Sequence, residues 1–243
     1  MKNQMTVILT GSTGGLGRNL AYEIQKLEKL SLIAVYRNQE KFRSIFGETG
    51  ITGYRLHEND SFRDILKLIP EGTSEVTLII NSFSIEPLKP VGNYRSEEID
   101  AMIDANIHQP VVLINLLAAY VKEHGIRLRI INLDSGAADF PLKGWGNYCA
   151  SKAYINAFLE VFQLENRDFR IVSIDPGVMD TEMQEKIRMV PDDVFDMVSE
   201  FRKYKEENVL RSPAFVAGYI VDRYIGAWNS TAFREHIDIN TVV

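Results

Sequence analysis

Tyr148 and Lys152 are spaced four residues apart, which on a helix places both side chains on one face, one turn from each other. A lysine charge held there favours the phenolate and lowers the pKa of the tyrosine, so that the phenol can exchange a proton near neutral pH. Ser135 lies upstream, just past the apolar segment 128–133. A hydroxyl at that point can donate to a carbonyl oxygen and hold it against the tyrosine. These three residues predict a site that transfers a proton to or from a carbonyl or alcohol oxygen.

Short apolar segments that read as strands alternate with amphipathic segments that read as helices along the whole chain. We expect strands at 5–10, 32–36, 53–57, 76–80, 129–133, 169–174 and 236–239, and helices at 16–27, 40–46, 62–69, 96–122, 148–165, within 181–207 and at 213–225. Wholly apolar strands alternating with helices predict an α/β fold with a parallel sheet of about seven strands, covered by helices on both faces. Right-handed crossovers make such a sheet doubly wound.

Several polar or glycine-rich segments directly follow predicted strands. They are the glycine-rich turn at 11–17, Asn81, Ser135 and the pair Pro176-Gly177. Because ligands of doubly wound sheets bind at the carboxyl ends of the strands, we expect these segments to converge on one site.

The composition is that of an ordinary globular protein, with 45% apolar and 25% charged residues. The net charge of −6 argues against binding to the phosphate backbone of nucleic acids and against a basic membrane-binding face. The longest apolar run, 110–121, is too short to span a bilayer, and residues 1–5 lead directly into a strand without a signal peptide. The single cysteine, Cys149, excludes an internal disulfide and fits a reducing cytoplasm; we expect it on the buried face of a helix, and we expect no metal site.

The Tyr148–Lys152 pair, Ser135 and the glycine-rich turn, in this order and at these distances, resemble the short-chain dehydrogenase/reductase family. The resemblance covers nearly the whole chain. It implies a single dinucleotide-binding Rossmann domain over residues 1–243, with a helical segment at about 178–211 that covers the substrate. It also implies a small-molecule carbonyl substrate and a homodimer or tetramer, formed through the helices near 96–122 and 148–165.

The glycine-rich turn matches the spacing of the classical members of that family. Gly11 allows the tight turn, Gly15 lets the backbone approach a pyrophosphate, and Gly17 permits close packing of the helix. We expect cofactor contacts from the whole turn, from Gly11, Ser12, Thr13, Gly15, Leu16 and Gly17. The spacing Gly11–Gly14–Gly17 also fits the extended and atypical branches; a chain of 243 residues leaves no room for the extended branch's C-terminal domain, and atypical members often lack the Tyr–Lys pair.

The residue at the end of the second strand selects the nucleotide. An acidic residue there would bind a ribose 2′-hydroxyl and favour NAD, but this chain has Tyr36 and Arg37. A guanidinium can grip a 2′-phosphate, so we expect NADP(H), the alternative being that Arg37 is a solvated loop charge. The resemblance further implies that Asp60 is a candidate for the adenine contact and that Asn81 follows the fourth strand at the nicotinamide ribose, with Ser84 in place of the family's glycine.

The resemblance assigns roles to the reacting residues. Tyr148 donates the proton, Lys152 lowers its pKa and bonds the nicotinamide ribose, and Ser135 polarises the carbonyl. Asn106 holds a water that links the lysine to bulk solvent. The turn Pro176, Gly177 and Val178 places backbone against the nicotinamide carboxamide, with Thr181 near the carboxamide or phosphate; the same segment also reads as a turn followed by an Asp180 or Thr181 helix cap.

Three further stretches, 143–149, 180–188 and 201–207, resemble the sepiapterin reductases and the related bacterial benzil reductases within that family, and 85–92 resembles the benzil reductases. Both groups reduce a carbonyl beside a second oxygen function, on a side chain carried by an aromatic ring. Trp145 could form an apolar wall for such a ring, and Met179, Met183 and Met189 an adaptable wall or, equally, a helical core stripe. Asp238 aligns with the aspartate that anchors pterin amino groups, or it serves only to tie down the last strand.

We therefore expect an NADPH-dependent carbonyl reductase that acts on vicinal diketones or α-hydroxyketones of aromatic systems. A general ketone or 3-oxoacyl reductase is the alternative on the same machinery. A non-catalytic dinucleotide-binding sensor is the alternative of another class, although the broken Ser–Tyr–Lys set expected of one is absent.

Overall fold

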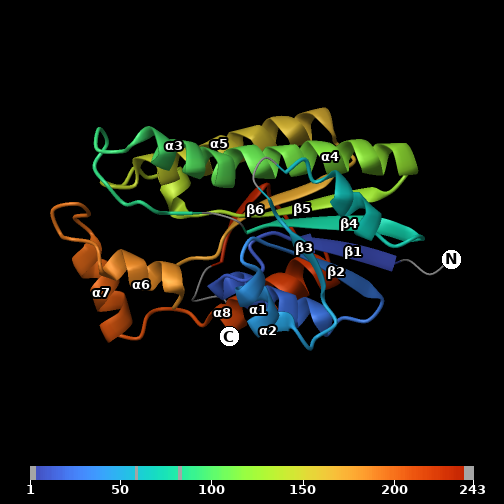
Figure 1. Cartoon of the computed structure of the whole chain (residues 1–243), viewed down its shortest axis with the longest axis horizontal. Coiled ribbons are helices and arrows are strands. Elements are labelled where there is room, and N and C mark those ends of the chain that lie inside the picture. The colour runs from blue at the N-terminus through green and yellow to red at the C-terminus, as the bar shows by residue number, and fades with distance from the viewer. Residues whose placement is uncertain (1–3, 58–59, 82–83, 238–243) are drawn as a thin grey trace.

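The computed structural model describes residues 4–57, 60–81 and 84–237, and within them seven parallel strands form one sheet. The strands are β1 Gln4–Leu9, β2 Leu30–Tyr36, β3 Thr52–Arg55, β4 Thr73–Ile80, β5 Arg127–Leu133, β6 Arg170–Asp175 and β7 Arg234–His236. Their order in the sheet is β3-β2-β1-β4-β5-β6-β7 (Figure 1). The direction of winding therefore reverses between β1 and β4, and this reversal is where such sheets bind ligands. The doubly wound parallel sheet predicted from the sequence is confirmed.

The helices connect the strands and cover both faces of the sheet. They are α1 Gly15–Gln25, α2 Gln39–Phe46, α3 Ser96–Ile103, α4 Gln109–His124, α5 Gly146–Glu165, α6 Glu182–Arg188, α7 Val198–Glu206 and α8 Pro213–Ile220. Two short 3₁₀ helices, η1 Arg63–Leu68 and η3 Gly136–Ala138, and two π-helical turns, η2 Asp104–His108 and η4 Val221–Gly226, complete the set. Two segments differ from expectation: 62–69 folds as 3₁₀ rather than α-helix, and the last strand begins at Arg234 rather than at 236.

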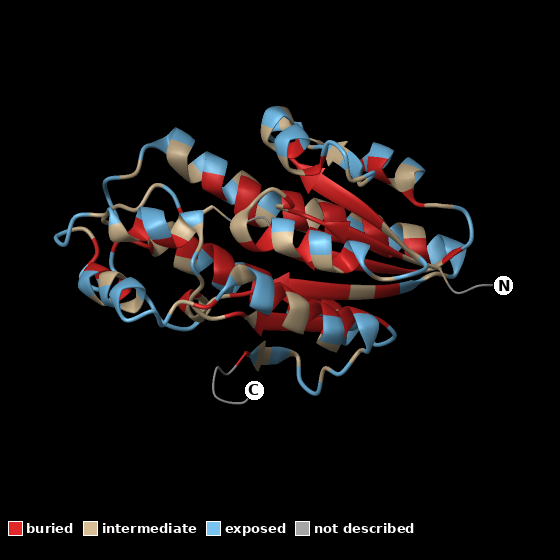
Figure 2. Ribbon diagram, turned by 90° about the horizontal axis from the view of Figure 1, so that it is seen from below, coloured by how far each residue is buried: buried red, intermediate tan, exposed pale blue. Residues whose placement is uncertain are grey.

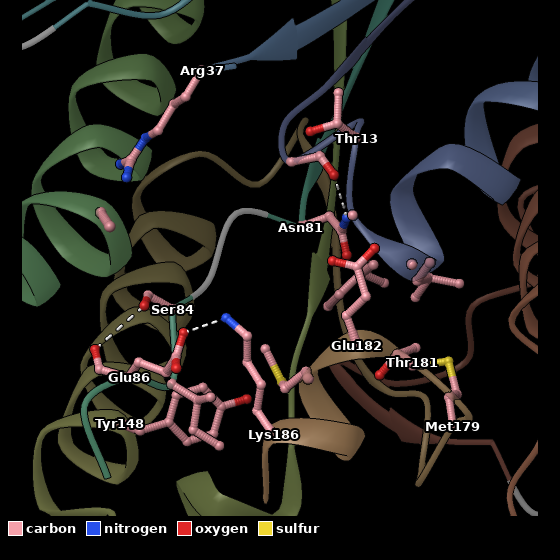
Figure 3. Close-up of a pocket in the computed structure, with 18 of the residues that line it drawn as sticks. Thr13, Arg37, Asn81, Ser84, Glu86, Tyr148, Met179, Thr181, Glu182 and Lys186 are labelled. Carbon is pink, nitrogen blue, oxygen red and sulfur yellow. Dashed lines mark hydrogen bonds and ion pairs between the residues drawn. The ribbon is translucent and has the colours of Figure 1, made fainter. Parts of the chain in front are cut away.

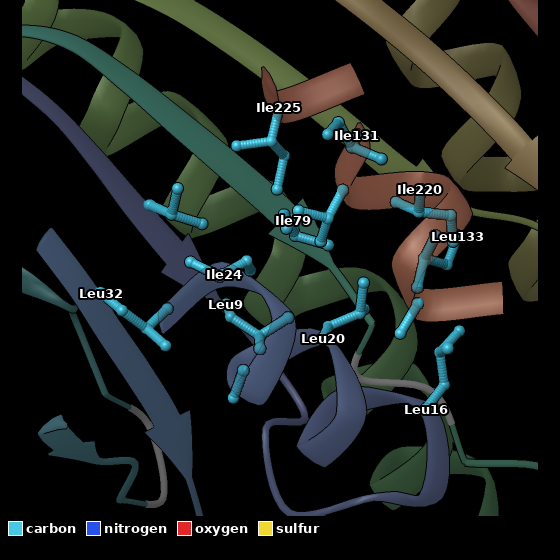
Figure 4. Packing of buried hydrophobic residues seen from close by; sticks show 14 of the residues in the cluster. Leu9, Leu16, Leu20, Ile24, Leu32, Ile79, Ile131, Leu133, Ile220 and Ile225 are labelled. Carbon is cyan, nitrogen blue, oxygen red and sulfur yellow. The ribbon is translucent and has the colours of Figure 1, made fainter. Parts of the chain in front are cut away.

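The sheet is buried on both faces because its strands carry apolar residues at consecutive positions. In β1, Val7 and Leu9 pack into the cluster formed with α1 and α8, whereas Ile8 packs into the cluster formed with α4 and α5. Leu20 and Ile24 of α1 lie one turn apart in the first cluster (Figure 4). Figure 2 shows the result, with buried strands between helices whose outer faces are exposed.

The helical run from Ser96 to His124 joins α3 to α4 through the π-helical turn η2. Among the described residues it is the one helix long and apolar enough to span a membrane, and half of its apolar window is buried inside the protein. Leu113, Ile114 and Leu117 of α4 pack onto the sheet, so this run is a core helix here. Gly125, with φ of 65°, adopts the left-handed conformation that terminates α4.

Helices α6 and α7 lie apart from the two main layers, beyond one end of the strands (Figure 1). A third apolar cluster joins them to the start of α5: Trp145 and Tyr148 contribute from α5 and its N-terminal flank, Ile187 from α6, and Val198 and Phe201 from α7. Because this cluster contains Tyr148, the packing of the two outer helices and the position of the tyrosine are coupled.

Candidate active site

A cleft of about 450 Å³ opens at the carboxyl ends of the strands (Figure 3). Many of the residues expected at a cofactor or substrate site line it: Gly11, Thr13, Gly15, Leu16, Arg37, Asn81, Tyr148, Lys152, Pro176, Met179, Thr181 and Met183. They come from chain segments more than 100 residues apart, and they meet because the loops and helices that carry them all lie after the carboxyl ends of strands of the same parallel sheet.

The glycine-rich turn is too tightly packed for side chains. Gly11 has φ of +61°, and a Cβ on it would lie 2.6 Å from the carbonyl oxygen of Asn81. A Cβ on Gly17 would lie 2.1 Å from the carbonyl oxygen of Gly11, so the helix packs directly on the turn. The Asn81 side chain fixes this contact by donating from Nδ2 to the Gly11 oxygen at 3.1 Å. Ser12 does not line the cleft; it is fully buried and its hydroxyl donates to Val35 of β2 at 2.8 Å.

The N-terminus of α1 faces the cleft without a side-chain cap. Its N-cap residue is Gly14, which has no side chain to cap the helix, and the first turn contains no acidic residue. Gly14, Gly15 and Leu16 line the cleft at this point. Uncapped helix-start amides, with no carboxylate beside them, form a site suited to a phosphate or pyrophosphate. A Cβ on Gly15 would lie 2.9 Å from Cγ2 of Thr181, so the absence of a side chain also lets the base of the outer helices approach the turn.

Arg37 lies at the rim of the cleft, at the end of β2. Its side chain is exposed, and Nη2 donates to Oε1 of Gln109 at 2.9 Å. Gln109 in turn donates to Asp104 of η2. Nearby, Lys41 of α2 forms an ion pair of 2.9 Å with Glu182 of α6. This pair links α2 to α6 at another part of the rim.

Asp60 does not line the cleft, contrary to its candidate role beside an adenine. Its Oδ1 accepts from the Tyr54 hydroxyl and from the Phe62 amide, both at 2.8 Å, and Oδ2 accepts from the His57 amide at 3.2 Å. The carboxylate therefore stabilises the loop to which it belongs. In this loop Phe62 adopts a left-handed φ of 54°. Leu56, which sequence reasoning did not select, lines the cleft in this region.

Asn106 is fully buried in the π-helical turn η2. Its Oδ1 accepts from the Ser84 amide at 2.7 Å, and its Nδ2 donates to the Ser84 carbonyl at 2.8 Å and to the Ser151 hydroxyl at 3.1 Å. The asparagine thus ties the segment after β4 to the part of α5 between Tyr148 and Lys152. π-Helical turns of this kind are frequent at functional sites.

The carboxyl end of β5 brings together the side chains of Ser135, Tyr148 and Lys152. The Tyr148 side chain is buried, and the Ser135 side chain lies close enough to its hydroxyl to act on its pKa. The Lys152 Nζ lies 5.7 Å from the centre of the Tyr148 ring and donates to the carbonyl oxygen of Leu133, at the end of β5, at 2.6 Å. Ser135 begins η3, and its Oγ accepts from the Ala137 amide at 3.2 Å, which orients the hydroxyl.

Burial dominates the titration of both residues. It raises the pKa of Tyr148 above its ordinary value, and the Ser135 side chain acts in the opposite direction without reversing the shift. Burial also lowers the pKa of Lys152 to about 7, although the negative charges of Asp134 and Asp175 oppose this shift. The sequence-based expectation of a lowered tyrosine pKa is therefore not met, because desolvation of the buried phenol raises its pKa.

The turn after β6 contributes Pro176, Met179 and Thr181 to the cleft, whereas Gly177 and Val178 lie behind it. Gly177 adopts a left-handed φ of 72°, and its amide donates to the Asp175 carboxylate at 2.9 Å. The Thr181 hydroxyl accepts from the Gln184 amide at 3.4 Å and caps α6, as one of the two readings of this segment predicts.

The residues expected to contact a substrate fall into three groups. Met179 and Met183 line the cleft. Trp145 does not: it is buried behind Tyr148, with ring centres 5.7 Å apart, and packs on Phe195 and Phe201 of the α7 region. Met189 is 71% exposed at the end of α6, away from any wall. Asp238 lies outside the described residues.

Two charged residues that the sequence did not single out lie at the same end of the cleft as Tyr148. Glu86, after β4, and Lys186, on α6, form an ion pair that joins the outer helices to the body of the protein (Figure 3). The pair is 100 residues apart in sequence, so no local pattern could have predicted it. Cys149, expected on the buried face of α5, is partly exposed.

Comparisons with known proteins agree with this geometry. Residues 5–191 match the family described as short chain dehydrogenase. A benzil reductase ((S)-benzoin forming) of Bacillus cereus is 32% identical over 225 residues, which cover 87% of this chain and 90% of the relative. A sepiapterin reductase of Bos taurus is 29% identical over 200 residues, covering 74% and 75% of the two chains. The crystal structure of the KRED1-Pglu enzyme superposes with a TM-score of 0.84 at 21% identity, covering 96% of this chain and all of the other. This chain therefore belongs to the short-chain dehydrogenase family and is an oxidoreductase that acts on CH–OH or C=O groups.

Proposed function

We propose that this protein is an NADPH-dependent carbonyl reductase whose substrates are vicinal diketones or α-hydroxyketones carried by aromatic systems. The observation that carries this proposal is that Tyr148 and Lys152 line the cleft one helical turn apart, with the Ser135 side chain close enough to Tyr148 to act on its pKa. A hydroxyl pair of this kind can bind one carbonyl oxygen from two sides.

The residues around the cleft fit a nicotinamide dinucleotide. The uncapped start of α1 and the side-chain-free surface at Gly11 and Gly15 would hold the pyrophosphate. Lys152 and Pro176, which line the cleft together with Tyr148, would hold the nicotinamide end, and Asn81, which bonds Gly11, would lie at the nicotinamide ribose. When bound, the reduced cofactor supplies the hydride that the carbonyl carbon accepts.

The chain's own residues handle the oxygen and the proton. Ser135 donates a hydrogen bond to the carbonyl oxygen and polarises it. Tyr148, kept protonated near neutral pH by its raised pKa, transfers its proton to the same oxygen as negative charge develops there. The Lys152 ammonium stabilises the phenolate that remains. Asn106 is a positioning residue, since it acts through Ser84 and Ser151.

Arg37 supports the choice of NADPH over NADH. It is exposed at the cleft rim at the end of β2, where Tyr36 and Arg37 stand instead of an acidic residue that could bind a ribose 2′-hydroxyl. Among the described residues its guanidinium donates to a neutral partner, the Gln109 side-chain oxygen, so a 2′-phosphate would be a stronger acceptor.

The substrate class rests on the benzil reductases and on the apolar side of the cleft. Ile85, Met179 and Met183 line the cleft, and Ile85 and Met183 belong to the same apolar cluster as Tyr148. The two methionines are flexible thioethers that can adapt to an aromatic ring. A charged pair, Glu86 and Lys186, offers polar partners beside them.

An initial-rate screen tests the proposal. NADPH and NADH are each assayed with benzil, sepiapterin, simple aryl ketones and a 3-oxoacyl thioester, and Tyr148→Phe serves as the inactive control. The expected result is turnover of benzil with NADPH that exceeds turnover of the simple ketones and the thioester. Preference for the thioester or for simple ketones would support the general reductase instead, and no turnover of any carbonyl, despite NADPH binding, would support a non-catalytic sensor.

Asp238 separates the diketone substrate from the pterin substrate. If a pterin is the natural substrate, Asp238→Asn raises the KM for sepiapterin at least about tenfold and leaves benzil unaffected, because only the pterin presents amino groups to a carboxylate. If Asp238 only ties down the last strand, both substrates and the melting temperature change together.

We also propose a cytoplasmic homodimer formed through α4 and α5. Val161 and Leu164 of α5 are 54% and 68% exposed, beside a hollow of about 430 Å³ between the two helices. Apolar residues gathered in this way are typical of a surface that a partner covers. Leu164→Asp should give a monomer by analytical ultracentrifugation, whereas Val209→Asp, exposed elsewhere, should leave a dimer; equal masses for both variants would contradict this interface.

A further inference from the structure

Asp134 is a buried carboxylate with no part in the chemistry described above. It lies between the end of β5 and Ser135, its side chain is 2% exposed, and it contributes to the wall of the cleft. Its amide donates to the Ile174 carbonyl of β6 at 2.7 Å, which fixes the backbone. A carboxylate so far from water must be compensated by charge or hydrogen bonds, so its surroundings are informative.

A buried polar layer beneath α5 presents hydrogen-bond donors to Asp134. Asn156 Oδ1 accepts from Ser173 Oγ at 2.6 Å and from Asn132 Nδ2 at 3.3 Å. Because these bonds occupy its oxygen, the Asn156 amide group points its Nδ2 toward Asp134 and donates to Oδ2 at 2.6 Å. Asn156 follows Tyr148 and Lys152 at the same four-residue spacing, so all three lie on one face of α5.

Arg234 of β7 binds the same carboxylate from the other side. Its Nη2 donates to Asp134 Oδ2 at 3.1 Å, and its two terminal nitrogens donate to Asp139 at 2.6 and 2.7 Å. One guanidinium thus serves two carboxylates, and the better contacts go to Asp139. Asp134 therefore remains incompletely neutralised, and its second oxygen, Oδ1, is buried with no hydrogen-bond partner among the described residues.

We propose that Asp134 is a positioning residue of this site, and that its buried carboxylate is the counter-charge that keeps the Lys152 side chain an ammonium ion. Two observations support this: Lys152 Nζ donates to the carbonyl of Leu133, the residue immediately before Asp134, and both side chains are almost fully buried. Burial lowers the pKa of Lys152, and Asp134 is the strongest of the influences that oppose this shift.

The other charged groups around Lys152 are weaker candidates. Asp175, at the end of β6, also favours the ammonium, but its side chain is 26% exposed and lies 3.2 Å from His236 of β7. Tyr148, on the same helix, is neutral because of its raised pKa. Asn106, across the cleft, carries no charge. Asp134 is the most deeply buried carboxylate of this set, so solvent screens its charge least.

A titration of Lys152 itself tests the proposal without substrate or cofactor. The protein is labelled with ¹³C at lysine Cε, the Lys152 resonance is assigned by its loss in Lys152→Met, and its chemical shift is followed against pH. Asp134→Asn should lower the midpoint by about one pH unit, a tenfold change in the protonation equilibrium. Asp139→Asn, which frees Arg234 to bind Asp134 more closely, is the matched control and should lower the midpoint by clearly less than Asp134→Asn does.

A second variant gives a shift of opposite sign. Arg234→Gln removes the cation beside Asp134, so the uncompensated carboxylate should raise the Lys152 midpoint. A general loosening of the loop would instead move Asp134→Asn and Arg234→Gln in the same direction. An unchanged midpoint in Asp134→Asn, an equal shift in Asp139→Asn, or equal signs for Asp134→Asn and Arg234→Gln would each overturn the proposal. The titration is valid whether or not the protein reduces a carbonyl, so failure of the proposed function would be seen separately.

Discussion

Asn106 Nδ2 donates to the Ser151 hydroxyl at 3.1 Å, and this contact fastens the π-helical turn between α3 and α4 to the part of α5 that lies between Tyr148 and Lys152. The Ser151 hydroxyl in turn donates to the Tyr148 carbonyl at 2.8 Å. The backbone that bears the tyrosine is therefore held from a neighbouring helix as well as by its own.

Replacing Asn106 should therefore cost both stability and activity. Asn106→Ala leaves the amide and the carbonyl of Ser84 without partners, and each unsatisfied buried group costs about 1–3 kcal/mol. We expect a lower free energy of unfolding in urea and a lower kcat. Asn115→Ala is the control, since Asn115 is an exposed asparagine of α4 whose side chain bonds only within its helix. Equal losses for both variants would show that the network around Asn106 has no special role.

The charge of Lys152 should make cofactor binding depend on pH. With its pKa lowered to about 7, Lys152 is charged below that pH and becomes neutral above it. An ammonium binds ribose hydroxyls and phosphates better than an amine does, so NADPH affinity should fall as pH rises from about 6 to about 8. Fluorescence titration of NADPH at several pH values measures this. Lys152→Met removes the titrating group, and a pH dependence that persists in this variant would have to come from elsewhere.

Arg37 should discriminate between the two nicotinamide cofactors. Arg37→Ala removes a charge-assisted contact to the 2′-phosphate, which costs about 1.5–3 kcal/mol of NADPH binding, and it leaves NADH nearly unaffected. Arg43→Ala, on the exposed side of α2, controls for a change in overall charge. Dissociation constants for both cofactors decide the question; a parallel loss for NADPH and NADH would remove Arg37 as the discriminator.

Gly11 should tolerate no side chain, for two separable reasons. Gly11→Ala suffers a positive φ and a collision of Cβ with the Asn81 oxygen at 2.6 Å, whereas Gly50→Ala suffers only a positive φ, of 71°, in open space. A strained φ costs about 1 kcal/mol or more, so Gly50→Ala should show that loss and Gly11→Ala a clearly larger one, with loss of NADPH binding. Chemical denaturation of the two variants would contradict this explanation if their stabilities fell equally.

Local spacing and strand order made much of the fold and part of the site predictable. Tyr148 and Lys152 meet because helix geometry fixes residues four apart, and Ser135 joins them because it follows the strand that precedes their helix. Trp145 could not be placed in the same way. Its indole packs on Phe195 and Phe201, and the path of that distant segment decides whether the ring lines the cleft or lies behind Tyr148.

Asp60 and Asp134 show what sequence reasoning could not see. Asp60 was selected by its place after a strand, and the structure adds that its carboxylate accepts three hydrogen bonds within its own loop. Asp134 was overlooked because nothing in the local sequence indicates that Asn156 and Arg234, 22 and 100 residues away, would both converge on it.

The proton donor is the central claim, and Tyr148→Phe tests it most directly. Phenylalanine keeps the ring that packs on Trp145 and removes only the hydroxyl. Tyr154→Phe, an exposed tyrosine on the same helix, is the matched control. The rate of NADPH oxidation with benzil, or with the best carbonyl substrate of the screen, should fall by about two to four orders of magnitude in Tyr148→Phe, with NADPH affinity almost unchanged. A Tyr148→Phe variant that retains more than about a tenth of the wild-type rate, in line with Tyr154→Phe, would contradict the account.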